Sequence, residues 1–293
     1  MKKFFVAIGK ALVYFLTYLL SQIVVTMGVM IYEAVRLVTP YILAGETYDL
    51  TAITMELLNA TLRLNNLILV LSAVLTLGIY LIVFKVRKKT LAQAVGLRPV
   101  RPLILWPLLL GGVALQFFVT FFMAALPIPE SIMMDYAQSA SVLDEGSLAW
   151  QILAICICAP LMEEILFRGL IYRRLKHGMP TAVAMLLQAL VFGVMHGNLL
   201  WFCYAACLGL LLGLVYENYQ SLWACIALHA AFNASSYLML LVQDVSPAGG
   251  YAVLGVSALA LAALVFVCIR QSKRLLAETA DTAAQNFPEE PVL

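Results

Sequence analysis

The sequence is divided into eight apolar stretches, most of them long enough to cross a lipid bilayer. A helix needs about 20 mostly apolar residues to span the hydrocarbon core. Backbone inside a bilayer must satisfy its own hydrogen bonds, and stretches of this length suit helices. Prolines and glycines separate the stretches. We therefore predict an all-α, polytopic integral membrane protein, a bundle of about eight transmembrane helices over residues 4–31, 65–84, 103–126, 148–172, 180–197, 199–216, 221–242 and 251–269.

The composition agrees with this class of protein. Hydrophobic residues make up 63% of the chain and charged residues 12%, and the mean hydropathy is +0.96. Soluble domains are typically about half apolar and about a quarter charged, so a soluble fold is excluded. The net charge of +2 is too small to indicate a nucleic-acid partner. All six cysteines lie in apolar stretches, and we interpret them as small apolar side chains without a disulfide framework.

The Lys and Arg residues predict the direction of the chain across the membrane. If the N-terminus is cytoplasmic and the spans alternate, fifteen of the eighteen fall on the cytoplasmic side, as the positive-inside rule requires. Only Arg36 and Arg63 lie outside, and Arg168 lies in the membrane. Both termini are therefore predicted to be cytoplasmic, and the first apolar run is interpreted as an uncleaved span because it is too long for a signal peptide. The predicted parts are 1–147, the first three spans and their loops; 148–242, a catalytic core of four spans; 243–274, the last span; and 275–293, a polar cytoplasmic tail without regular structure.

Three ionisable residues lie within six positions of the fourth span. Such a residue near the bilayer centre costs about 2.5–3.5 kcal/mol on insertion scales and usually faces a bundle interior or a cavity. Glu164 and Arg168 are four residues apart and share a helix face, so they can pair. Glu163 is turned away from Arg168. A carboxylate without a cationic partner in low dielectric suits a general base near neutral pH, so the spacing predicts Glu163 as the reactive group and Glu164–Arg168 as a structural pair.

Two histidines and an asparagine lie in later spans. His229 and Asn233 are four residues apart on one face, and His196 lies near the end of the fifth span. A single histidine inside a membrane can simply hold helices together by a hydrogen bond. Two histidines, a carboxylate and an amide in one bundle can also activate a water, either through a zinc ion or through Glu163 and a histidine without metal. Asn233, with or without His229, would then stabilise an oxyanion on a peptide carbonyl.

At these residues the chain resembles the CPBP family, the membrane proteases of CAAX processing and bacteriocin processing or immunity, also called the abortive-infection family. Its motifs EExxxR, FxxxH and HxxxN correspond to Glu163–Arg168, Phe192–His196 and His229–Asn233, within residues 148–242. The resemblance implies an activity like that of type II CAAX prenyl endopeptidases. It implies that Glu163 activates water with the help of His196, and that His229 and Asn233 bind the oxyanion or contribute to a metal site. Because the family is usually labelled metalloprotease, a divalent ion, zinc, is predicted on Glu163, His196 and His229.

We therefore predict an intramembrane metalloendopeptidase that cleaves a membrane-associated substrate, with Glu163, Glu164, Arg168, His196, His229 and Asn233 as its site. The expected partners are a peptide or lipidated-protein substrate in the bilayer, prenylated of CAAX type or a bacteriocin, pheromone or surface protein, and membrane lipid. A non-proteolytic immunity or scaffold protein of the same fold is the alternative. A transporter is also considered, but no repeated half of the kind that transporters often show is present. Family analogy favours a bacterial plasma membrane.

The depths of the site residues do not agree along straight helices. At about 1.5 Å per residue, Glu163 would lie roughly 15 Å and His196 roughly 24 Å from the cytoplasmic ends of their spans. Groups that react together should be level. We expect a tilt, a kink at Pro160, or a shift in the boundaries of the fourth to sixth spans.

Overall fold

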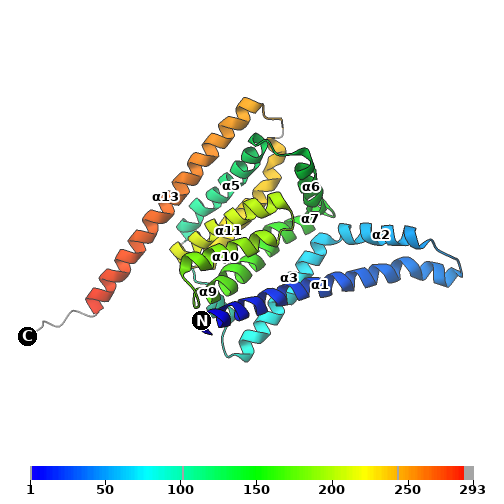
Figure 1. Cartoon of the computed structure of the whole chain (residues 1–293), viewed down its shortest axis with the longest axis horizontal. Helices are drawn as coiled ribbons and strands as arrows, with labels where there is room; N and C mark the ends of the chain where they lie inside the picture. The colour runs from blue at the N-terminus through cyan, green and yellow to red at the C-terminus, as the bar shows by residue number, and fades with distance from the viewer. Residues whose placement is uncertain (1, 101, 243, 287–293) are drawn as a thin grey trace, which may run out of the picture.

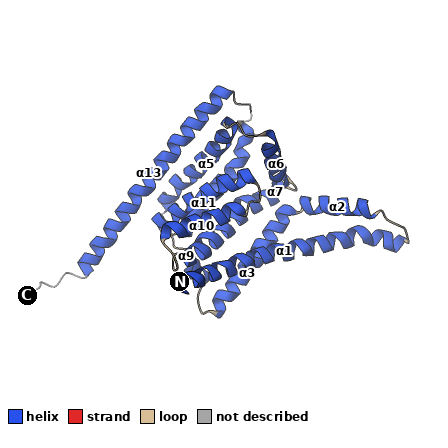
Figure 2. Ribbon diagram, in the orientation of Figure 1, coloured by secondary structure: helices blue, strands red, loops and turns tan. Residues whose placement is uncertain are grey.

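The chain folds into a bundle of helices. The computed structural model describes residues 2–100, 102–242 and 244–286, and this part of the chain contains no strand (Figure 2). The helices of the first half are α1 (Lys2–Ala44), α2 (Leu50–Arg63), α3 (Asn65–Val86), α4 (Leu91–Val95), α5 (Pro102–Ala125), α6 (Glu130–Ser141) and the 3₁₀ turn η1 (Val142–Asp144). The second half contains α7 (Leu148–Gln151), the π-helix η2 (Ile152–Cys158), α8 (Ala159–Glu164), the π-helix η3 (Ile165–Tyr172), α9 (Arg173–Leu175), α10 (Thr181–Val194), α11 (Leu199–Tyr219), α12 (Leu222–Ala234), the 3₁₀ helix η4 (Ser235–Leu241) and α13 (Pro247–Asn286).

Seven helical segments of the described chain are long and apolar enough to cross a membrane. The all-α, polytopic architecture is therefore confirmed, but the fifth of the eight predicted spans, residues 180–197, is shorter than expected. Helix α10 has only 14 residues, which is about 21 Å at 1.5 Å per residue and less than the roughly 30 Å hydrocarbon core. The chain turns at Gly197, where φ is +72°, and the Asn198 side chain accepts a hydrogen bond from the backbone N–H of Leu200 at 3.0 Å to begin α11.

The helices divide into a packed bundle and a long N-terminal hairpin. Helices α10 and α11 lie side by side, α12 packs on α5, and α13 follows the outer side of α5 (Figure 1). Helix α1 has 43 residues and packs against α3 and η3, and its second half extends beyond the bundle alongside α2 (Figure 1). Helix α13 continues through residue 286, so the tail predicted to lack regular structure from residue 275 is helical up to that point, and residues 287–293 lie outside the described chain.

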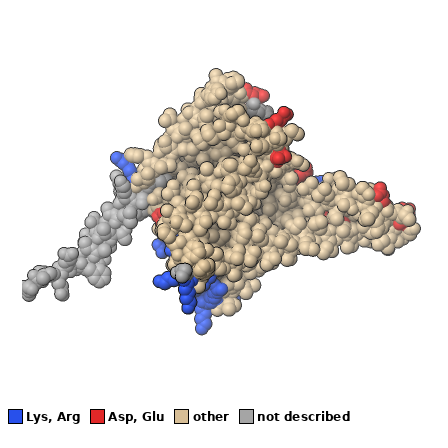
Figure 3. All heavy atoms as spheres, viewed as in Figure 1, with Lys and Arg blue, Asp and Glu red and all other residues tan. Residues whose placement is uncertain are grey.

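Basic and acidic side chains gather at opposite sides of the molecule. In the view of Figure 3, most Lys and Arg residues lie on the side of the bundle where α1 starts, and most Asp and Glu residues lie at the far end and on the hairpin. This separation is the charge asymmetry from which the cytoplasmic location of the termini was predicted. The direction relative to a membrane remains a prediction.

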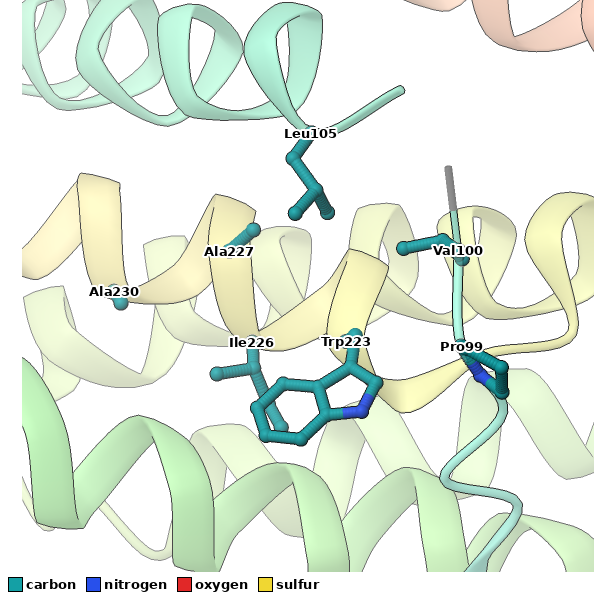
Figure 4. Close-up of a pocket in the computed structure, with 7 residues that line it drawn as sticks. All are labelled: Pro99, Val100, Leu105, Trp223, Ile226, Ala227 and Ala230. Atoms are coloured by element: carbon teal, nitrogen blue, oxygen red, sulfur yellow. The ribbon is translucent and has the colours of Figure 1, made fainter. Parts of the chain in front are cut away.

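An apolar groove of about 330 Å³ lies on the outside of the bundle, between the start of α5 and α12 (Figure 4). None of its lining residues belongs to the predicted site. They are Pro99, Val100, Leu105, Trp223, Ile226, Ala227 and Ala230.

Helix α12 is held in place by a close approach to α5 at Gly112. A Cβ atom at this position would overlap the backbone carbonyl oxygen of Leu228 and would lie 2.7 Å from the Cβ of Ala231. His229 lies between these two residues in sequence, so this contact fixes the backbone that carries it.

We expect Gly112→Ala to lower the melting temperature of the detergent-purified protein, because overpacking in a closed contact costs about 1–3 kcal/mol. The measurement is thermal unfolding followed by tryptophan fluorescence. The control is Gly78→Ala in α3, where a Cβ meets nothing within 4 Å. It should keep or slightly raise the melting temperature, since alanine is the better helix former. Equal melting temperatures for the two variants would contradict the packing described.

Candidate active site

A fully buried ion pair lies at the centre of the site. Arg168 in η3 donates from Nη1 to Glu164 Oε1 at 2.8 Å, and both side chains are 0% exposed. The Nη2 atom of Arg168 donates to the carbonyl oxygen of Gly209 in α11 at 3.2 Å. The Cζ atom of Arg168 lies 4.6 Å from the centre of the Phe192 ring in α10. The pair expected from the four-residue spacing is therefore formed, and it joins the fourth span to α10 and α11.

Glu164 also orients His229, which the sequence did not indicate. The Nδ1 atom of His229 lies 2.8 Å from Glu164 Oε1. A carboxylate accepts hydrogen bonds, so Nδ1 carries the hydrogen and donates it. The other ring nitrogen, Nε2, is then directed to Glu163, whose Oε2 lies 3.7 Å away. Because 65 residues separate Glu164 from His229, no local spacing could reveal this contact.

Glu163 is turned away from Arg168, as predicted. Its Oε2 atom is buried and has no hydrogen-bond partner among the described residues, while its side chain as a whole is 18% exposed. The 3.7 Å separation from His229 Nε2 is too long for a direct hydrogen bond. The two groups therefore face the same space without satisfying each other.

Pro160 leaves free the backbone carbonyl group to which the Asn233 side chain donates. The N–H of Ala159 donates to the carbonyl oxygen of Ala154, five residues earlier, which is the π-helical pattern. The next acceptor in this pattern is the carbonyl oxygen of Ile155, but Pro160 has no N–H to donate to it. Asn233 Nδ2 donates to that oxygen instead, at 2.8 Å. The sequence predicted a possible kink at Pro160, and the structure has a π-helix, a feature frequent at functional sites.

His196 lies in the turn that follows α10, and not within a span as predicted. Its Nδ1 is 2.8 Å from the carbonyl oxygen of Phe192. Since a carbonyl only accepts, Nδ1 carries the hydrogen, and Nε2 of the neutral ring is left with a free lone pair.

His196 is level with Glu163, so the depth difference calculated from straight helices is wrong. The Phe192 ring lies 5.0 Å from the Phe167 ring and 5.9 Å from the His229 ring, between centres. His196 follows Phe192 by four residues and Glu163 precedes Phe167 by four, in antiparallel segments, so both lie one turn further from the basic end. One reason is that the fourth span continues to Leu175, three residues beyond its predicted end, which places Glu163 deeper than the estimate.

A cavity of about 900 Å³ brings the predicted residues together. Glu163, His196, His229 and Asn233 line it, whereas Glu164 and Arg168 lie behind its wall. The three motifs all lie after the first three spans, yet the cavity is also lined by polar residues of α1, α5 and α6. These are Tyr18, Gln22, Gln116 and Tyr136. Their only signal in the sequence is a polar side chain within an apolar stretch or beside one.

The residues predicted to bind zinc do not form a complete ligand set. Glu163 and His229 face each other, and both histidines donate from Nδ1, an arrangement that leaves Nε2 free for a ligand, as in many metal sites. Across the described chain, however, no group of three or more His, Cys, Asp or Glu side chains is close enough to hold a metal ion. The present arrangement therefore does not fit a three-ligand zinc site, and the zinc remains a prediction.

The fold and the cavity define a multi-pass membrane protein with a buried carboxylate–histidine site. A family model described as type II CAAX prenyl endopeptidase Rce1-like matches residues 145–235, which contain all three motifs. The resemblance stated from the motifs is confirmed over this stretch. Neither the curated proteins nor the solved structures give a match to the chain. The family match supports an intramembrane endopeptidase in general.

We expect Arg168→Leu to destabilise the protein strongly, because it leaves the Glu164 carboxylate buried without its cation. Breaking a buried pair in this way costs about 3–5 kcal/mol. The matched control is Arg63→Leu, since Arg63 and its partner Glu56 are 54% and 45% exposed. An exposed pair contributes about 0–1 kcal/mol, so this variant should behave as wild type. The measurement is the melting temperature and the yield of monodisperse protein in detergent; similar losses for both variants would contradict the role of the buried pair.

Proposed function

We propose that this protein is an intramembrane endopeptidase in which Glu163 activates the hydrolytic water. The observation that carries the proposal is the unpartnered Oε2 of Glu163, which lies 3.7 Å from His229 Nε2 on the wall of a large cavity. An enclosed carboxylate that a neighbouring ion pair leaves unneutralised is available to take a proton. The Rce1-like match supports the same class of reaction.

In the first step, a water in the cavity loses a proton to Glu163 as its oxygen attacks the carbonyl carbon of the scissile peptide bond. The free Nε2 of His196 accepts a second hydrogen bond from that water and orients it. In the second step the C–N bond breaks, and the proton held by Glu163 passes to the leaving amine. The products are a carboxylic acid and an amine, and Glu163 is again a carboxylate. General acid–base catalysis of this kind contributes about 10²–10⁴-fold.

His229 and Asn233 stabilise the oxyanion that forms on the carbonyl oxygen. Asn233 uses one Nδ2 hydrogen for the carbonyl oxygen of Ile155, and its second hydrogen remains for the substrate. His229 contributes through Nε2 once Glu163 has taken the proton of the water and that nitrogen carries a hydrogen, while Glu164 holds the ring through Nδ1. Donors that are fixed before the reaction are the most effective stabilisers of such a charge.

The proposed substrate is a peptide segment at the end of a membrane-anchored or lipidated protein. Support comes from the family description, which names CAAX prenyl endopeptidases, and from a cavity enclosed by apolar helices and lined at intervals by amides and tyrosines. Bacteriocin, pheromone and surface-protein precursors are substrates of the same chemistry. We also propose a bacterial plasma membrane as the location, on family analogy.

We expect Glu163→Gln to reduce kcat/KM by at least about 100-fold, since the amide keeps the shape of the side chain but cannot accept the proton. The protein is reconstituted in liposomes and given internally quenched CAAX peptides, with and without a farnesyl group. Glu217→Gln is the control, because Glu217 is paired with Lys176 at 2.6 Å and does not line the cavity. Undiminished cleavage by Glu163→Gln would overturn the mechanism.

The competing functions have separate readouts. An immunity or scaffold protein predicts that Glu163→Gln restores the phenotype of a deletion strain as well as wild type does, and a transporter predicts solute flux in the same liposomes. The zinc prediction requires a stoichiometric ion in purified protein that His229→Ala loses, as measured by elemental analysis.

A further inference from the structure

Helix α1 closes the catalytic cavity from the N-terminal half of the chain. Tyr18 and Gln22 are four residues apart on one face of α1, and both side chains line the cavity. Helix α1 also packs against η3, the segment that carries Arg168. A polar pair of α1 therefore faces the residues of the three motifs across the same cavity.

The hydroxyl group of Tyr18 has a hydrogen to donate. Gln22 Nε2 donates to the Tyr18 oxygen at 3.0 Å, so that oxygen acts as an acceptor in this contact. The hydroxyl hydrogen of Tyr18 is left for another partner. The hydrogen bond from Gln22 occupies one acceptor position of the Tyr18 oxygen and so restricts the positions that this hydrogen can take.

The matching acceptor lies across the cavity. Glu163 lines the same cavity as Tyr18. Its Oε2 atom is buried and has no hydrogen-bond partner among the described residues. A hydroxyl hydrogen without an acceptor and a carboxylate oxygen without a donor, in one cavity and without a direct hydrogen bond, are commonly bridged by a water.

We propose that Tyr18 is a further catalytic residue of this site, whose hydroxyl donates a hydrogen bond to the water that Glu163 activates. The inference rests on the proposed peptidase function. Tyr18 holds the water from the α1 side, while Glu163 and His196 accept its two hydrogens. One lone pair of the water oxygen then accepts from Tyr18, and the other is aimed at the peptide carbonyl.

The test compares Tyr18→Phe with Tyr14→Phe in the liposome assay. Tyr14 lies one turn earlier on α1, does not line the cavity, and accepts a hydrogen bond from Arg87 Nη1 at 3.2 Å. We expect Tyr18→Phe to lower kcat about tenfold, the scale of one hydrogen bond, with KM unchanged, and Tyr14→Phe to leave both constants unchanged. Equal kcat values for Tyr18→Phe and an active wild type would overturn the proposal.

A double-mutant cycle on thermal stability tests the link without any substrate. Tyr18→Phe and Glu163→Gln should be non-additive, with the shift in melting temperature of the double variant differing from the sum by about 2 °C or more, since the two groups share one water. Tyr14→Phe combined with Glu163→Gln should be additive. Additive shifts for Tyr18 and Glu163 would overturn the role of Tyr18. If wild type cleaves no peptide, the proposed function fails, and the cycle alone decides whether Tyr18 and Glu163 are coupled.

Discussion

The buried charge of Glu164 sets the arrangement of the rest of the site. An ion that is 0% exposed inside a membrane protein has to find its partners within the bundle. Arg168 neutralises it, and His229 donates to the same oxygen. Arg168 in turn is held by the carbonyl oxygen of Gly209, to which Gln188 Nε2 of α10 also donates at 2.9 Å. One carboxylate therefore ties the fourth span to α10, α11 and α12, and it fixes the ring that faces the cavity.

The two adjacent glutamates have opposite environments for a simple geometric reason. Successive residues of a helix point in different directions, so an arginine four positions after Glu164 cannot also neutralise Glu163. The π-helical segments on either side of α8 then set the position of this pair relative to the other helices. Pro160 frees a carbonyl group in the first of them, and that group holds the amide of Asn233 at the cavity wall. Pro160, which has no backbone N–H, therefore determines where the donor group of Asn233 is placed.

The local features of the site could be predicted from the sequence, and its long-range contacts could not. The ion pair and the free Glu163 follow from spacing on one helix, and the motifs identify His196, His229 and Asn233 as members. Nothing local indicated that Glu164 would hold His229, or that α10 would be too short to cross a membrane. The positions of Tyr18 and Gln22 in the cavity could not be predicted either, because an uncharged polar side chain in an apolar helix does not require a buried partner as a charge does. Helix boundaries were least accurate at the N-terminus, where a span predicted to end at residue 31 continues to Ala44 because apolar residues alone do not mark where a helix leaves the membrane.

The placement of Glu164 and Arg168 on one helix also bears on how the chain enters the membrane. Transmembrane helices are inserted first and associate with one another afterwards. When the fourth span is inserted, α11 and α12 have not yet been synthesised, and neither Gly209 nor His229 is available as a partner. The ion pair needs no later helix, because both of its charges leave the ribosome within four residues of each other. Biogenesis of this span is therefore independent of the second half of the core, whereas Glu163 has to wait for that half before its final surroundings exist.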